Sequence, residues 1–255
     1  MQHQSARQQL EGAQHHEALV CAVAVFLTGG CADDVHAQAT PRCGFKDSQS
    51  RMNCSGTDIQ KQRDDVNNTP MSAVHQVNAA AAGERRQVSF AGLSSSGYVF
   101  TWRAHTPYDD IQARRHGFDG APAGPQVQVN TFTGMNGGGR SQPVAAALAG
   151  GGYAIAWMSQ FQDPGRSVDI YLQRFGEDGA PLGMETRVSS DTSATALGPA
   201  IVGLAGGGFV VTWSFSGPEC EFVVVQRFAA DGSRLGEETR VDPPAPTEPA
   251  PDCFD

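Results

Sequence analysis

Short stretches with alternating large and small side chains recur three times along the chain. Each copy begins at a glycine and ends at a tryptophan: Gly97-Tyr-Val-Phe-Thr-Trp102, Gly152-Tyr-Ala-Ile-Ala-Trp157 and Gly208-Phe-Val-Val-Thr-Trp213. Large groups occupy every second position, and neither set of positions carries a charge. Because successive side chains of a strand point to opposite faces, this pattern predicts strands covered on both faces, as in stacked sheets.

The tryptophans are 55 and 56 residues apart, and three other phrases keep the same period. An apolar run precedes each initial glycine, an arginine followed by Asp-Gly comes after each tryptophan, and a phrase with valine and a polar residue closes the unit. Asp-Gly between strand-like runs favours a tight hairpin, so each unit predicts four short antiparallel strands. The shared arginines are Arg115, Arg174 and Arg227, the closing valines are Val129, Val188 and Val241, and an early copy of the closing phrase contains Val77.

This period indicates the fold class. Four antiparallel strands in roughly 50–60 residues match one blade of a β-propeller. We therefore predict an all-β fold of three four-stranded blade-like repeats. Because closed propellers use about four to eight blades, this is a partial β-propeller or an open repeat stack, completed by oligomerisation or by a longer array. We interpret Trp102, Trp157 and Trp213 as packing anchors between sheets, and the shared arginines as hydrogen-bond donors from one blade to the next.

The segments outside the repeats differ in composition. Residues 40–74 are polar and predict a loop-rich or disordered lead-in, and the Pro-rich residues 243–255 predict an extended tail. The repeat region itself covers residues 75–242, with units at about 75–130, 131–189 and 190–242.

Residues 1–39 resemble a secretory signal. The apolar stretch Ala18–Leu27 is too short to cross a bilayer as a helix but suits a signal h-region, and Ala37-Gln38-Ala39 matches a cleavage site. Lipid attachment at Cys31, as in a bacterial lipoprotein, is the alternative. We therefore expect a secreted, cell-surface or periplasmic bacterial protein without a transmembrane segment.

Cysteine usage agrees with export. The mature chain would keep four cysteines outside any Cys-x-x-Cys arrangement, which favours disulfides over a zinc site. Three pairings are open, and four free thiols are the alternative. We favour one pair that closes a small loop and one that ties the tail to the last unit: Cys43 with Cys54 and Cys220 with Cys253.

Charge and motifs narrow the function. The net charge of −9 without a basic run argues against a nucleic-acid partner. No G-x-S-x-G elbow or phosphate-binding loop is present, so we expect neither catalysis nor a cofactor. The loop between the second and third strand of each unit carries two acidic residues and is the candidate ligand surface. Ca²⁺ is the one ion that these oxygens could bind, although their spacing departs from the EF-hand pattern. These residues are Asp109, Asp110, Asp163, Asp169, Glu219 and Glu221.

The phrases Leu-Ala-x-Gly-Gly-Phe-Val-Val-Thr-Trp, Gln-Arg-Phe-x-x-Asp-Gly and Gly-x-Glu-x-x-Val resemble repeats of large secreted bacterial proteins, of the adhesin-like and hemolysin-type calcium-binding kinds. The resemblance covers about residues 75–242 and is clearest in the second and third units. It implies a β-propeller-like extracellular module rather than an enzyme. The chain lacks the Gly-Gly-x-Gly-x-Asp nonapeptides that often accompany such repeats, which weighs against calcium binding.

The expected function is that of an exported, non-catalytic β-repeat module that binds a glycan or a protein through its loops. The first alternative is the remnant of a propeller-type carbohydrate-active enzyme. The second is a structural spacer without a ligand.

Overall fold

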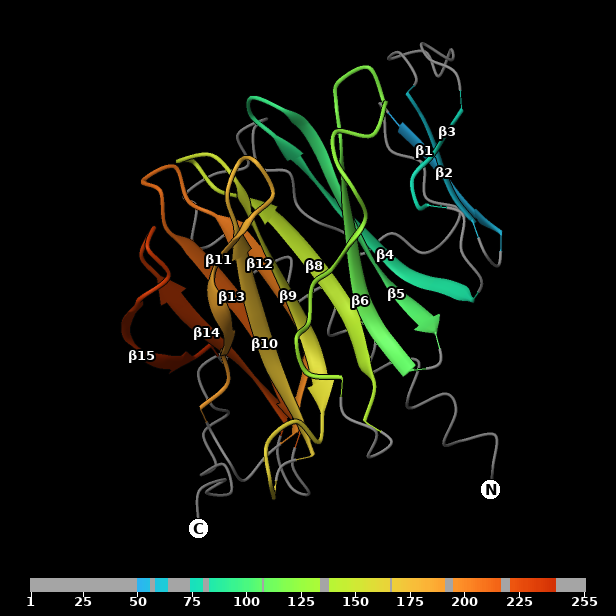
Figure 1. Cartoon of the computed structure of the whole chain (residues 1–255). Helices are drawn as coiled ribbons and strands as arrows, with labels where there is room; N and C mark the ends of the chain where they lie inside the picture. Colours follow the sequence, from blue (N-terminus) through green and yellow to red (C-terminus); the bar gives the residue numbers. More distant parts are fainter. Residues whose placement is uncertain are drawn as a thin grey trace.

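The described part of the chain consists of strands and turns in four antiparallel sheets, which stand side by side in chain order (Figure 1). The computed structural model describes residues 50–55, 58–63, 74–79, 83–106, 108–133, 138–165, 167–190, 195–216 and 221–241. Within these ranges no helix has the length and apolar character needed to span a membrane. The predicted signal segment and the Pro-rich tail lie outside the described residues, as do Cys43, Cys220 and Cys253.

Three of the sheets have four strands each, and one three-stranded sheet precedes them. The three-stranded sheet contains β1 (Ser50–Ser55), β2 (Asp58–Arg63) and β3 (His75–Gln76). The first four-stranded sheet contains β4 (Glu84–Leu93), β5 (Gly97–Thr106), β6 (Tyr108–His116) and β7 (Val127–Gln128). The second contains β8 (Arg140–Ala147), β9 (Tyr153–Gln160), β10 (Val168–Phe175) and β11 (Pro181–Arg187). The third contains β12 (Thr195–Gly203), β13 (Phe209–Ser216), β14 (Glu221–Phe228) and β15 (Arg234–Arg240).

Each four-stranded sheet is a meander in which strands adjacent in sequence pair antiparallel. The glycine clusters form the turns between first and second strands, and the Asp-Gly phrases form the turns between third and fourth strands. Gly120, Gly179 and Gly232 of those phrases have φ values of 87°, 85° and 86°, a region that glycine enters without steric cost. The all-β fold with three four-stranded blade-like repeats is therefore confirmed.

The segment ahead of the repeats differs from the prediction. Polar composition in residues 40–74 predicted loops or disorder, yet β1 and β2 form a hairpin there and β3 pairs with β2. The closing phrase at Val77 is thus not an isolated fourth strand. Ile59 and Val77 are fully buried and pack with Trp102. The other described members of this cluster come from the first four-stranded sheet, so the neighbouring sheet supplies most of the core here.

The three tryptophans occupy equivalent places between neighbouring sheets. Trp102 lies between the three-stranded sheet and the first four-stranded sheet, Trp157 between the first and second, and Trp213 between the second and third. All three are fully buried, and no indole Nε1 has a hydrogen-bond partner. In this structure the three indole rings therefore contribute apolar packing between sheets.

A bulge with a left-handed residue recurs in the first strand of each four-stranded sheet. Gln87, Gln142 and Gly198 have φ values of 54°, 50° and 60°, and each lies where the pairing with the next strand shifts by one residue. The side-chain Oε1 of Gln87 accepts the backbone N–H of Gln142 at 3.0 Å. A one-residue shift exchanges the two faces of a strand. Side chains on the N-terminal side of the bulge therefore lie on the face opposite to the one that alternation, counted back from the end of the strand, would give them.

Two of the shared arginines, Arg115 and Arg174, connect successive sheets. The Arg115 guanidinium donates to the carbonyls of Glu177 and Asp178, and the Arg174 guanidinium donates to the carbonyl of Ala230 at 2.9 Å. Each arginine lies against the glycine of the Asp-Gly turn in the next unit. A Cβ atom at Gly179 would lie 2.7 Å from Arg115 Nε, so this contact also requires glycine.

Replacing Arg115 by alanine is expected to lower the free energy of unfolding by about 1 kcal/mol, because two charge-assisted hydrogen bonds between sheets are lost at a partly exposed site. Arg227, the equivalent residue of the third sheet, is exposed, and its guanidinium makes no hydrogen bond to another described residue. The matched variant Arg227→Ala should therefore change stability by less than about 0.5 kcal/mol. Urea unfolding followed by circular dichroism measures both, and equal losses would contradict the connecting role.

Candidate functional site

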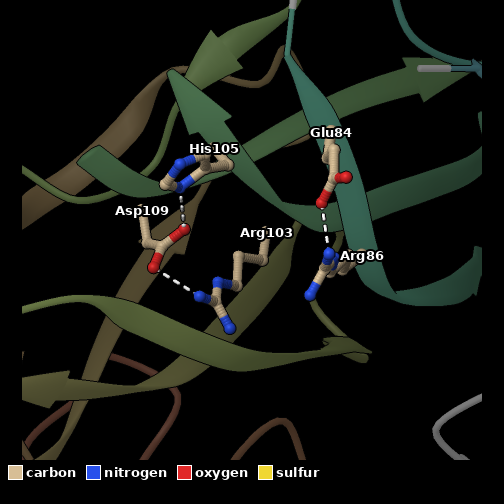
Figure 2. Close-up of a pocket in the computed structure, with 5 residues that line it drawn as sticks. All are labelled: Glu84, Arg86, Arg103, His105 and Asp109. Carbon is tan, nitrogen blue, oxygen red and sulfur yellow. Dashed lines mark hydrogen bonds and ion pairs between the residues drawn. The ribbon is translucent and has the colours of Figure 1, made fainter. Parts of the chain in front are cut away.

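A polar cleft lies at the end of the first four-stranded sheet where β5 turns into β6. Five residues from three neighbouring strands line a space of about 170 Å³. Figure 2 shows them as two ion-paired groups. Glu84 and Arg86 belong to β4, Arg103 and His105 to β5, and Asp109 to β6.

Strand register places these side chains on one face of the sheet. Arg86 is paired directly with Arg103, and His105 stands between Glu84 on one neighbouring strand and Asp109 on the other. Further along β5 and β6, the same face carries Val99 and Ile111, which pack against the second sheet. The cleft is therefore the polar end of the interface between the first and second sheets.

Ion pairs connect the residues of the cleft. Arg103 donates from Nη2 to Asp109 Oδ2, and His105 Nδ1 lies 2.9 Å from Asp109 Oδ1. Arg86 forms a second ion pair with Glu84. Burial by itself raises the pKa of Asp109, but the hydrogen bonds and positive charges of Arg103 and His105 outweigh it and hold the pKa below its ordinary value. Asp109 is therefore an ionised acceptor at neutral pH.

A buried arginine lies next to this cleft. Arg140 at the start of β8 is fully buried; its Nη1 donates to the Gly138 carbonyl at 3.1 Å, and its guanidinium lies 4.7 Å from the Phe132 ring centre. Its Nε and Nη2 have no hydrogen-bond partner. Burial lowers the pKa of Arg140, and the charges of Asp110, Glu185 and Asp109 partly oppose this. The interface between the first two sheets thus carries an excess of buried N–H donors.

A second polar network lies at the equivalent end of the second sheet. Asp163 Oδ2 accepts from the Tyr171 hydroxyl at 2.8 Å and from Arg187 Nη1 at 3.0 Å. Burial raises the pKa of Tyr171, and its hydrogen bond to Asp163 raises it further. Glu185 accepts from Gln162 at 2.6 Å and from the backbone N–H of Thr131 at 2.7 Å, so this end of the sheet also contacts the segment between β7 and β8.

Asp110 and Asp169 lie within strands β6 and β10, and not in the loops where the sequence suggested ligand residues. Both are buried. Asp110 accepts from Asn130 Nδ2 at 2.8 Å, while Asn130 Oδ1 accepts the N–H of Ile111. Ser189 joins Asp169 to the N–H of Ile170 in the same way. These two carboxylates therefore anchor the segment after the fourth strand to the third strand in the first and second four-stranded sheets, which also explains the polar residues after Val129 and Val188.

The remaining predicted ligand residues fall in different places. Asp109 and Asp163 are at the expected strand ends, but each is engaged in the network of its own sheet. Glu219 lies outside the described residues, and only the backbone of Glu221 is described. Across the described ranges, no three His, Cys, Asp or Glu side chains gather closely enough to hold a metal ion. Of the predicted disulfide residues, the structure describes the backbone of Cys54 in β1 and nothing of the other three.

Sequence reasoning did not identify Glu84, Arg86, Arg103 and His105. A signal was present in the strand that follows each initial glycine. After its tryptophan the first unit continues with Arg103-Ala-His105, whereas the second and third units continue with Met158-Ser-Gln160 and Ser214-Phe-Ser216. Charged residues at positions that are neutral in the other repeats mark the place where the first unit has diverged.

Two exposed aromatic side chains lie at the same end of the first two sheets. Tyr108, 39% exposed, begins β6 next to Asp109, and Phe161, 52% exposed, directly follows β9. Both therefore lie in the loops between second and third strands.

No family model matches the chain, and no curated protein matches it in sequence. Its structure is similar to that of a puromycin hydrolase, with a TM-score of 0.51 and 13% identity over 80% of this chain and 32% of that chain. The chain therefore spans about a third of that enzyme's length. It is also similar to an endo-arabinase from Bacteroides thetaiotaomicron, with a TM-score of 0.46 and 13% identity over 82% of each chain. A family-43 endo-arabinanase from Bacillus licheniformis gives a TM-score of 0.45 and 12% identity over 78% of each chain. At these identities the similarity concerns the fold alone.

Proposed function

We propose that the chain is an exported carbohydrate-binding module whose ligand contacts the polar cleft of the first four-stranded sheet. The observation that carries this proposal is the cleft itself. Arginine N–H groups, the His105 ring and carboxylate oxygens line a space of about 170 Å³. A few convergent polar groups that fix orientation are characteristic of ligand sites, and arginine N–H groups can donate to the hydroxyl, ring and carboxyl oxygens of sugars.

The neighbouring aromatic residues support the same ligand class. The apolar face of a sugar ring stacks on aromatic side chains, and Tyr108 and Phe161 present such rings at this end of the first two sheets. Export is proposed on the sequence signals, and the secreted bacterial repeats that the sequence resembles agree with it. The loops between second and third strands would then face a ligand outside the cell.

The proposal predicts that the purified full-length chain binds oligosaccharides on a glycan array and that His105→Ala and Tyr108→Ala weaken the binding about three- to tenfold. A factor of this size corresponds to the loss of one neutral hydrogen bond or ring contact. Titration calorimetry with the best array ligand measures the change.

Phe118→Ala is the matched control. Phe118 is 50% exposed just beyond the opposite end of β6, so its loss removes a similar aromatic surface without touching the cleft. Equal weakening by Tyr108→Ala and Phe118→Ala would refute the cleft as the site. A chain that binds no glycan on the array would favour the spacer alternative instead.

A carbohydrate-active enzyme is the second candidate. Glu84, Asp109 and His105 share the cleft, and paired carboxylates are the usual groups for glycoside hydrolysis. The endo-arabinase and endo-arabinanase among the similar structures suggest which substrates to try, although the similarity itself concerns the fold alone. Release of reducing sugar from arabinan or xylan, abolished in Asp109→Asn, would favour this candidate over a binding module.

A further inference from the structure

Three of the four carboxylate oxygens of the cleft already have charged protein partners. Asp109 uses Oδ1 for His105 and Oδ2 for Arg103, and Glu84 uses Oε2 for Arg86. A ligand that donated hydrogen bonds to these oxygens would have to displace charged partners. The cleft is therefore poorly suited to a ligand that offers mainly hydroxyl donors.

Donor groups remain in excess. A guanidinium carries five N–H bonds, and Arg86 and Arg103 each use one nitrogen for a carboxylate. The Nε of Arg103 is buried without a partner. An unmade bond at a buried donor is costly, so the unoccupied N–H groups favour a ligand with acceptor oxygens.

The two arginines also face one another. Arg86 and Arg103 are directly paired across β4 and β5, and the Cβ atoms of such a pair lie about 5 Å apart. The two positive charges repel each other in this arrangement. Glu84 is ion-paired only with Arg86, and Asp109 is ion-paired with Arg103. An anionic group placed between the two guanidinium groups would relieve the repulsion and could accept from both in the bidentate geometry that arginine favours.

We propose that the cleft selects a carboxylate-bearing sugar, a uronic acid residue of an acidic glycan, with its carboxylate held between Arg86 and Arg103. This inference rests on the proposed function and names the class of its ligand. The net charge of −9 does not oppose it at short range, because charges further than about 8 Å apart are largely screened at physiological ionic strength.

Titration of the full-length chain with tetragalacturonic acid and with its fully methyl-esterified form tests the proposal. The two probes differ only in the charge and acceptor capacity of their carboxyl groups. We expect the acid to bind at least about tenfold more tightly than the ester, and high salt to weaken only the acid. Arg86→Gln, at an exposed position, and Arg103→Gln should each weaken binding of the acid about tenfold and leave binding of the ester unchanged. Arg227→Gln, with the same charge change on the third sheet, should have no effect.

Equal affinity for acid and ester, or binding of neutral arabino- and xylo-oligosaccharides while tetragalacturonic acid fails, would overturn the acidic ligand and leave the proposed carbohydrate function intact. Failure of every glycan would overturn both. Full binding by a folded Arg86→Gln variant would overturn the role of the arginine pair. The thermal melt of each variant separates loss of binding from loss of fold.

Discussion

Replacing Trp157 by alanine is expected to lower the free energy of unfolding by about 3–5 kcal/mol, which approaches the whole stability of a marginal domain. The ring is fully buried in the cluster that joins the first and second sheets, and it stacks on Tyr171 with ring centres 6.3 Å apart. A cavity of this size cannot collapse easily, because strands on both sides are held by ladder hydrogen bonds. Urea unfolding followed by far-ultraviolet circular dichroism measures the loss.

Trp157→Phe is the control, and it should cost only about 1–2 kcal/mol. Phenylalanine keeps most of the apolar volume, and the indole Nε1 that it removes makes no hydrogen bond. If both variants lost the same stability, the tryptophan would act through its N–H group or through strain, and not through packing.

Replacing Gly152 by alanine is expected to lower the free energy of unfolding by at least about 2 kcal/mol and to reduce the yield of folded protein. The backbone φ of Gly152 is 76°, where a side chain costs about 1–2 kcal/mol. A Cβ atom there would also lie 2.2 Å from the carbonyl oxygen of Phe175. Relief would require the turn to move away from β10. Thermal and urea unfolding of the purified variant measure the effect.

The chain provides a matched control within the same run of glycines. A Cβ atom at Gly150 would meet nothing within 4 Å, and this residue has no positive φ. Gly150→Ala should therefore leave stability unchanged within about 0.5 kcal/mol, or raise it slightly by restricting the unfolded chain. A loss at Gly150 as large as that at Gly152 would show that the turn tolerates no substitution for reasons other than backbone geometry.

Divergence of one repeat from the others accounts for the cleft. The second and third units end their second strands in neutral residues, and Met158, the equivalent of Arg103, packs in the core cluster between the second and third sheets. In the first unit, Arg103 and His105 stand at these places. Their charged or polar groups require a counter-charge, which Asp109 of β6 provides. The scaffold is thus shared by all three units, whereas the candidate site belongs to one.

Most of the fold could be predicted from the sequence, because its determinants are local. The uncharged alternation of large and small groups around Tyr153, Ile155 and Trp157 indicates a strand covered on both faces, and Asp178-Gly179 indicates the hairpin that follows β10. A period of 55 and 56 residues shows that the same unit is built three times. The hairpin of β1 and β2 was missed, because its polar strands depend on a neighbouring sheet for most of their core.

The site depended on contacts that the sequence pattern does not encode. Continued alternation back from Leu93 would place Arg85 on the face that holds the cleft. The bulge at Gln87 shifts the pairing by one residue. Glu84 and Arg86 therefore lie on the face with the cleft, and Arg85 lies buried on the opposite face. Sequence position was equally insufficient for Asp110 and Asp169. Their place next to acidic loops suggested ligand oxygens, but in the structure they accept hydrogen bonds from Asn130 and Ser189.

The sequence by itself thus determined the all-β class, the strand order within each sheet and the places of the tryptophans, because side-chain alternation and glycine conformation act over a few residues. Only the tertiary structure decided which charges meet. Strand register, the bulge and the stacking of sheets are set by packing between distant segments, and a shift of one residue moves a charge from the core to the cleft.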